Sequence, residues 1–92
     1  MDKTYIISID MPAPELLTFE LRSSDGEVID TVECAYTRPV DNLLLTTVDN
    51  LLNRSSIDRF ALIAVELGMG IDKSSSLYRI VQSFAAAIVA TR

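Results

Sequence analysis

One carboxylate and one loop are the parts of this chain whose residue types and positions could do chemistry. Asp10 ends the β-branched run Thr4–Asp10, and a carboxylate at the end of a strand can bind magnesium. Lys73 follows Gly68 and Gly70, and such a loop could bind an anion at the start of a helix. Each feature also has a simpler interpretation, which we favour. Asp10 would then be a turn or cap residue, and the loop an ordinary connection between a strand and a helix.

Composition removes several kinds of active site. The chain has no histidine, so it cannot build a Ser/His/Asp or Cys/His triad or a histidine-based metal site. Its single cysteine, Cys34, has no second thiol for a disulfide or a zinc cluster and fits a small buried strand residue. The formal net charge of −5 disfavours direct nucleic-acid binding, which needs clustered cations. We therefore expect no enzyme activity and no cofactor.

Length and hydropathy predict one domain and no membrane span. Ninety-two residues suit a single core, so residues 1–92 are expected to form one domain. Hydrophobic residues make up 49% of the chain, but they occur in short blocks, too short to cross a bilayer. The start of the chain lacks the features of a signal peptide, and we expect a cytoplasmic protein.

The first third of the chain has the patterns of three strands. Thr4–Asp10 is the first, ended by the prolines that begin at Pro12. Leu16–Arg22 alternates apolar and polar residues, which is the period of a sheet with one wet face. The dipeptide Asp25-Gly26 is a favoured turn, and Glu27–Tyr36 resumes the β pattern. These blocks predict a three-stranded antiparallel meander.

The remainder predicts helix, strand and helix. Apolar residues recur at helical spacing from Pro39 to Asn53. Phe60–Leu67 is almost continuously apolar, which is typical of a parallel strand covered on both faces. Ser74–Ser76 offers an N-cap for a last helix that runs close to the C-terminus. The predicted class is α/β (α+β) with the order β-β-β-α-β-α. This order opens the ribonuclease H-like fold of actin, Hsp70 and sugar kinases, and it also fits other α+β domains.

Particular residues add a resemblance to a family. The run Ile-Ile-Ser-Ile-Asp at 6–10, the Asp25-Gly26 turn, the leucine-rich first helix, the strand 60–68 and the helix that begins Ser-Leu-Tyr-Arg-Ile at 76–80 together resemble the N-terminal half of TsaB, also called YeaZ. The family's glycine-rich segment before the last helix is replaced here by residues 70–77. TsaB is the partner protein of bacterial tRNA threonylcarbamoyladenosine formation.

This resemblance implies a function through partners. TsaB has the ribonuclease H-like, actin-like ATPase fold, yet it is regarded as non-catalytic and pairs with the TsaD ATPase or with itself through its N-terminal half. It implies the same for this chain: a homodimer or a complex with a TsaD-like ATPase. In kinase-like relatives of the fold, a carboxylate at the position of Asp10 holds magnesium and phosphate.

The last helix carries the expected contact surface. Its core stripe is predicted to comprise Leu77, Ile80, Val81, Phe84 and Ile88. The opposite side is small and nearly uncharged, whereas a solvated helix normally carries Lys and Glu there, so we expect another protein to pack against it. Alanine as a good helix former is the simpler alternative. The predicted contact strip is Ser76, Arg79, Ser83, Ala86, Ala87 and Ala90.

Three functional hypotheses follow. The leading one is a short TsaB-like interaction subunit that uses the contact strip. The second is a degenerate nucleotide-binding domain of the actin-like fold that uses Asp10, Gly70 and Lys73. The third is a stand-alone structural or regulatory domain outside tRNA modification, which only its physiological partner separates from the first.

Overall fold

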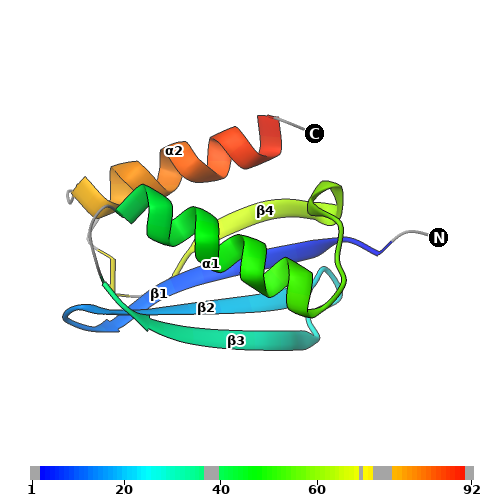
Figure 1. The fold of residues 1–92 in the computed structure, drawn as a ribbon, viewed down its shortest axis with the longest axis horizontal. Coiled ribbons are helices and arrows are strands. Elements are labelled where there is room, and N and C mark those ends of the chain that lie inside the picture. Colours follow the sequence, from blue (N-terminus) through cyan, green and yellow to red (C-terminus); the bar gives the residue numbers. More distant parts are fainter. Residues whose placement is uncertain (1–2, 37–39, 69, 72–75, 91–92) are drawn as a thin grey trace.

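The computed structural model describes residues 3–36, 40–68, 70–71 and 76–90, with side chains left out at 40, 41, 76 and 88–90. The elements follow the order β-β-β-α-β-α, with a short 3-10 turn before the last strand. A four-stranded sheet has the order β3-β2-β1-β4, and both helices pack on one of its faces (Figure 1). The predicted fold class, an antiparallel meander with one parallel strand, is confirmed.

Strands β1 (Tyr5–Ala13), β2 (Leu16–Ser23) and β3 (Val28–Ala35) form the meander. The prediction that the first strand ends before Pro12 was wrong, because β1 continues to Ala13 through a register shift between Asp10 and Ala13. A proline is tolerated in such an irregularity, where its missing N–H removes no ladder hydrogen bond. The β2–β3 turn at Asp25-Gly26 is confirmed, with Gly26 at a φ of 103°.

Helix α1 (Val40–Arg54) and helix α2 (Ser76–Ala90) supply one wall of the core, and the alternating residues of β1 and β2 supply the other. The predicted helix start at Pro39 lies outside the described residues. Leu17, Phe19 and Leu21 on β2 are fully buried, as the alternation predicted. The whole buried apolar cluster is Ile7, Ile9, Leu17, Phe19, Leu21, Leu44, Val48, Leu51, Leu52, Leu62, Leu77 and Val81.

Strand β4 (Leu62–Leu67) pairs in parallel with β1 and forms one edge of the sheet. Two predictions about the run 60–67 were wrong. Its first residues form the 3-10 turn Arg59–Ala61, because the Asp58 side chain caps that turn by accepting from the Phe60 N–H at 2.9 Å. The strand is also not covered on both faces, since no layer packs on its second face within the described part of the chain: Glu66 is exposed.

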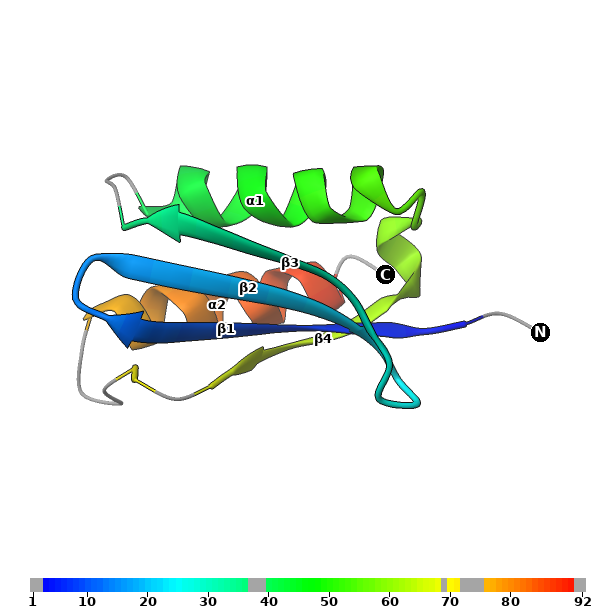
Figure 2. The ribbon, with the colours of Figure 1, turned by 90° about the horizontal axis from the view of Figure 1, so that it is seen from below.

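A cluster of polar side chains lies on the face of the sheet away from the helices, where β1 and β2 pass in front of α2 in Figure 2. Its centre is Arg22, whose Nη2 donates to Ser8 Oγ at 2.9 Å and pairs with Glu66 Oε2 at 3.0 Å. The Nε of Arg22 lies 3.4 Å from Glu20 Oε1. Arg22 thus joins β1, β2 and β4 on this face, while the fully buried apolar residues of β1 and β2 turn to the helices. No helix in the described ranges is long and apolar enough to span a bilayer.

Candidate functional site

The structure brings Asp10 and the glycine loop together at one corner. The parallel pairing of β1 with β4 ends there at Ile9 and Leu67, and Asp10 is the next residue of β1. A Cβ placed on Gly68 would overlap Oδ1 of Asp10, and one placed on Gly70 would overlap the carbonyl oxygen of Met11. Gly70 also has a φ of 87°, which side chains rarely adopt. The glycines therefore permit close packing of the loop against the end of β1.

Gly70 thus packs on Met11, the residue after Asp10, which brings two of the three residues of the nucleotide-binding hypothesis to one corner, while Lys73 lies outside the described residues. The loop backbone occupies the space beside the Asp10 carboxylate. Within the described part of the chain, no three His, Cys, Asp or Glu side chains gather into a set that could hold a metal ion. This geometry suits a packed strand-to-helix connection at least as well as a ligand site.

The outer side of α2 presents the predicted contact strip to solvent. Arg79, Ser83, Ala86 and Ala87 are all exposed. Ser76 and Ala90 lie at the first and last positions of α2, and their side chains are outside the described residues. On the inner side, Leu77 and Val81 are buried, and Ile80 and Phe84 are only half-buried. The predicted division of the helix into a core side and an outer side therefore holds, with a core side that is incompletely covered.

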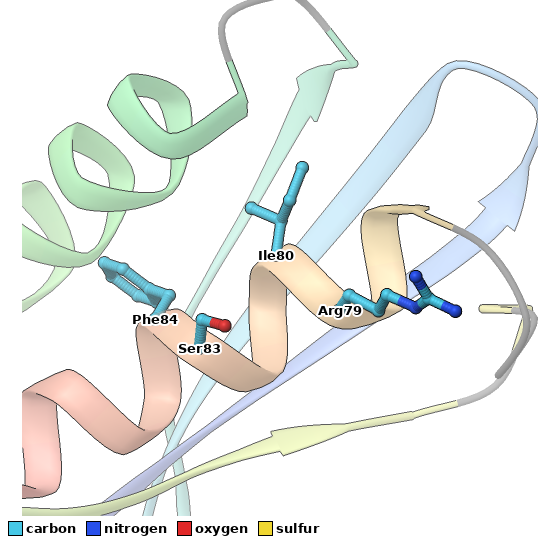
Figure 3. A pocket seen from close by; sticks show the side chains of 4 residues that line it. All are labelled: Arg79, Ile80, Ser83 and Phe84. Atoms are coloured by element: carbon cyan, nitrogen blue, oxygen red, sulfur yellow. The ribbon is translucent and has the colours of Figure 1, made fainter.

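A shallow open hollow of about 390 Å³ lies on one flank of this strip. Its walls are Arg79, Ile80, Ser83 and Phe84. Figure 3 shows Ile80 and Phe84 pointing toward α1, while the Arg79 side chain extends toward the start of α2. The hollow thus combines an apolar wall with one cation at its end.

A second hollow of about 700 Å³ lies on the other flank, between α2 and β4. Strand β4 contributes Val65, Glu66 and Leu67 to its walls. Helix α2 contributes four side chains, two of them joined by a hydrogen bond of 3.0 Å from Gln82 Nε2 to the Tyr78 hydroxyl. These four residues are Tyr78, Gln82, Ala85 and Ala86.

The contact strip is therefore a ridge with a hollow on each side, because Arg79 and Ser83 border the first hollow and Ala86 borders the second. We call these three residues, together with Ala87, the α2 ridge. Sequence reasoning placed Ile80 and Phe84 in the core and did not single out Tyr78 and Gln82. Helical periodicity separates an inner from an outer side, but it carries no signal for how far a neighbouring strand or helix covers the flanks.

The ridge offers small side chains and one cation. Arg79 is the one ionisable group among the four residues of the ridge, and Tyr78 and Glu66 are the ionisable side chains that line the second hollow. Small side chains on a helix allow the backbone of another helix to approach closely, and a groove on each side can receive that helix's larger side chains. The geometry of this surface fits the packing of another protein.

Comparisons with known proteins give a likeness in structure. No protein-family model and no curated protein sequence matches the chain. YeaZ from Pseudomonas aeruginosa matches with a TM-score of 0.69 and 18% identity, over 96% of this chain and 39% of that one. A structure described as an uncharacterized protein with similarity to peptidase YEAZ, from the same organism, matches with a TM-score of 0.70, 18% identity and the same coverage.

Both matches cover almost the whole of this chain, so the likeness includes the sheet and both helices. The chain spans only 39% of the length of these two structures. At 18% identity the likeness concerns the fold alone, and it does not extend to the residues of the α2 ridge. Over the 39% of YeaZ that it covers, the chain has the same fold, which corresponds to part of the ribonuclease H-like, actin-like ATPase fold.

Proposed function

We propose that this chain is a non-catalytic, TsaB-like subunit that acts by binding a second protein through the α2 ridge. The partner is a further copy of the chain or a TsaD-like ATPase, and the process served is tRNA threonylcarbamoyladenosine formation in the cytoplasm. The observation that carries the proposal is the outer side of α2. It is exposed, small and nearly uncharged, and it is flanked by two hollows.

Energetics support association at this surface. Phe84 and Ile80 are only half-buried in the isolated chain, and a partner that fills the first hollow removes their remaining apolar surface from water. Burial of apolar surface contributes about 25 cal/mol per Å². Arg79, at the end of the same hollow, offers a cation for a carboxylate of the partner, which would fix the orientation of docking.

Charge insertion on the ridge tests the proposal. Ser83→Glu and Ala86→Glu each place a carboxylate on exposed positions, so the melting temperature of the isolated chain should stay the same. At a buried interface the unpaired charge costs at least about 3 kcal/mol, which corresponds to roughly 100-fold weaker binding. Thr46→Glu, on the exposed side of α1, is the matched control and should leave binding unchanged.

The measurement is affinity capture of the tagged chain and its variants from native lysate, with the captured proteins quantified by mass spectrometry. We expect a TsaD-like ATPase with the wild type and with Thr46→Glu, and its loss with Ser83→Glu and Ala86→Glu. If both ridge variants capture the same proteins in the same amounts as the wild type, the ridge is not the binding surface.

One observation favours a second candidate function, a degenerate nucleotide-binding domain. Gly68 lies against Asp10 and Gly70 lies against Met11, directly after the parallel pairing of β1 with β4 ends. Open α/β sheets commonly bind ligands near the carboxyl ends of such paired strands. Bound magnesium nucleotide at 100 times its Kd would stabilise the fold by about 2.7 kcal/mol. A melting temperature that is the same with and without magnesium nucleotide counts against this candidate, and one that rises in the wild type but not in Asp10→Asn supports it.

A further inference from the structure

The outer side of strand β3 is occupied by side chains of this chain itself. Within the described residues, β3 ends the sheet order and pairs with β2 (Figure 1). A strand in this position presents a row of backbone N–H and C=O groups with which another strand can pair. Two neighbouring features of β3, a break in register at Ile29 and the carboxylate of Asp30, interrupt that row.

One hydrogen bond at the end of β3 shows which of its backbone groups face outward. The Tyr36 N–H donates to the Glu15 carbonyl oxygen at 2.7 Å, so the backbone of Tyr36 faces the β2 side. Successive residues of a strand turn their N–H and C=O groups to opposite sides. Counted back in steps of two, Asp30 also faces β2, and Thr31 presents its N–H to the outer side.

The carboxylate of Asp30 already accepts this outward N–H. The Thr31 N–H donates to Asp30 Oδ1 at 2.9 Å. Arg54 of α1 holds the same carboxylate at two points, because its Nη2 donates to Oδ1 at 3.2 Å and its Nε lies 3.2 Å from Oδ2. A two-point contact between guanidinium and carboxylate fixes the orientation of both groups. The Asp30 side chain is only 19% exposed, so it is held at the edge of the sheet.

The break in register lies directly beside this carboxylate. Asp30 pairs with Leu21, and Val28 pairs with Arg22, so the register skips Ile29. An extra residue of this kind bends a strand and increases its twist, which disfavours the addition of a further strand. Val28 and Ile29 are 54% and 37% exposed. The irregularity therefore falls on the exposed apolar residues of β3, where pairing would otherwise be attractive.

We propose that Asp30, anchored by Arg54, is an autoinhibitory contact that closes the β3 edge to strand addition. The carboxylate takes the outward N–H of Thr31 that an added strand would use. It also places a negative charge beside the carbonyl oxygens of such a strand. This surface is separate from the α2 ridge, so its closure does not depend on which protein the ridge binds. Association of the chain is thereby directed away from β3.

Asp30→Ala should open the edge. All variants are made on a Ser83→Glu parent, which suppresses association through the α2 ridge. When two opened edges pair antiparallel, the Thr31 N–H of each copy gains a partner, so the association constant from sedimentation equilibrium should rise about 30-fold. Glu33→Ala is the matched control, because it removes the same charge from β3 and leaves the Thr31 N–H capped. Its association constant should equal that of the parent.

Thr31→Pro separates the capped N–H from the charge. Proline has no N–H and is tolerated on an edge strand where that group faces outward. Added to Asp30→Ala, it should return the association constant to the value of the parent. Val32→Pro is the control for backbone direction, since Val32 faces β2, where it is paired with Phe19. It should lower the melting temperature markedly, whereas Thr31→Pro should keep the circular dichroism spectrum of the parent.

Hydrogen exchange followed by NMR tests the cap without opening the edge fully. Arg54→Ala releases the anchor of Asp30 at an exposed position, so the fold should persist and the Thr31 amide should exchange about three- to tenfold faster. Glu33→Ala should leave that rate unchanged. Equal association constants for Asp30→Ala and Glu33→Ala overturn the proposal. So does a Thr31 exchange rate that is the same in Arg54→Ala as in the parent.

Discussion

The two helices of this chain bury their inner sides and present different outer sides. Helix α1 buries Leu44, Val48, Leu51 and Leu52, and its exposed side carries Thr46, Asp49, Asn50 and Asn53 with one half-exposed leucine, Leu45. Helix α2 buries only Leu77 and Val81 in the described range. Its exposed residues are Arg79, Gln82, Ser83, Ala86 and Ala87.

The two helices therefore differ in how polar their exposed sides are. Both helices are long enough to cover the sheet, so covering it does not explain why only α1 has a solvated outer side. The exposed side of α1 carries mainly polar, hydrogen-bonding side chains, whereas on α2 two alanines, Ala86 and Ala87, accompany the polar ones. This apolar part of the α2 surface costs less to remove from water. More of the core is buried by α1, and we propose that α2 provides the binding surface.

The largest expected effect is on the core of α1. Leu51→Ala removes a fully buried side chain and should lower the free energy of unfolding by about 2–5 kcal/mol. Val81→Ala on α2 removes two methyl groups and should cost roughly 1–3 kcal/mol. Urea denaturation measures both, with Thr46→Ala as a surface control. An equal or larger loss in Val81→Ala would remove the distinction between the helices.

Substitution of Leu45 should have an intermediate effect, and its effect on affinity tests whether the binding surface extends from α2 onto α1. It is 51% exposed on α1, so Leu45→Gln should change the free energy of unfolding by less than about 0.5 kcal/mol. If Leu45 belongs to the surface that the α2 ridge forms, partner binding should weaken about three- to tenfold. Calorimetric titration gives this number, and unchanged affinity confines the surface to α2.

The thiol of Cys34, on the α1 side of the sheet, should make the free energy of unfolding depend on pH. Burial raises the pKa of the Cys34 thiol above its usual 9.0, with a smaller opposing effect from the Thr47 side chain of α1. The folded state thus holds the proton more tightly than the unfolded state. The contribution of Cys34 to stability should be constant below about pH 9 and should fall as the pH rises through the folded pKa. Cys34→Ala should remove this slope, as urea melts between pH 8 and 11 would show.

The smallest expected effect on stability is at the β2–β3 turn, which is not part of either helix. A hydrogen bond from the Ser23 hydroxyl, aided by the Glu27 backbone, lowers the pKa of Asp25 below 3.8. Its contribution is present above that pH and is lost as the pH falls through the folded pKa. Because Asp25 is exposed, Asp25→Asn should reduce the acid dependence of stability only slightly. Melting temperatures from pH 2 to 6 provide the check.

Local patterns predicted most of the fold. The alternation in β2, the Asp25-Gly26 turn and the helical spacing in α1 and α2 each depend on neighbours in the sequence, and each was confirmed. The start of β4 was missed because an apolar run contains no signal that its first residues form a 3-10 turn. That turn depends on a cap from Asp58, a polar residue outside the run.

The candidate site was predicted only in part, for a related reason. Periodicity identified the exposed positions Arg79, Ser83, Ala86 and Ala87. The two hollows depend on where α1 and β4 end relative to α2, which is a property of tertiary packing. Likewise, the sheet order that makes β4 an edge is set by how all four strands pair. A single strand's composition does not reveal it.

The central claim, that the α2 ridge binds a partner protein, is tested most directly by calorimetric titration of a TsaD-like ATPase from the same organism with the purified chain. The wild type and Thr46→Glu should bind with the same affinity, and Ser83→Glu should bind about 100-fold more weakly at an unchanged melting temperature. Equal affinities for all three proteins would contradict the account.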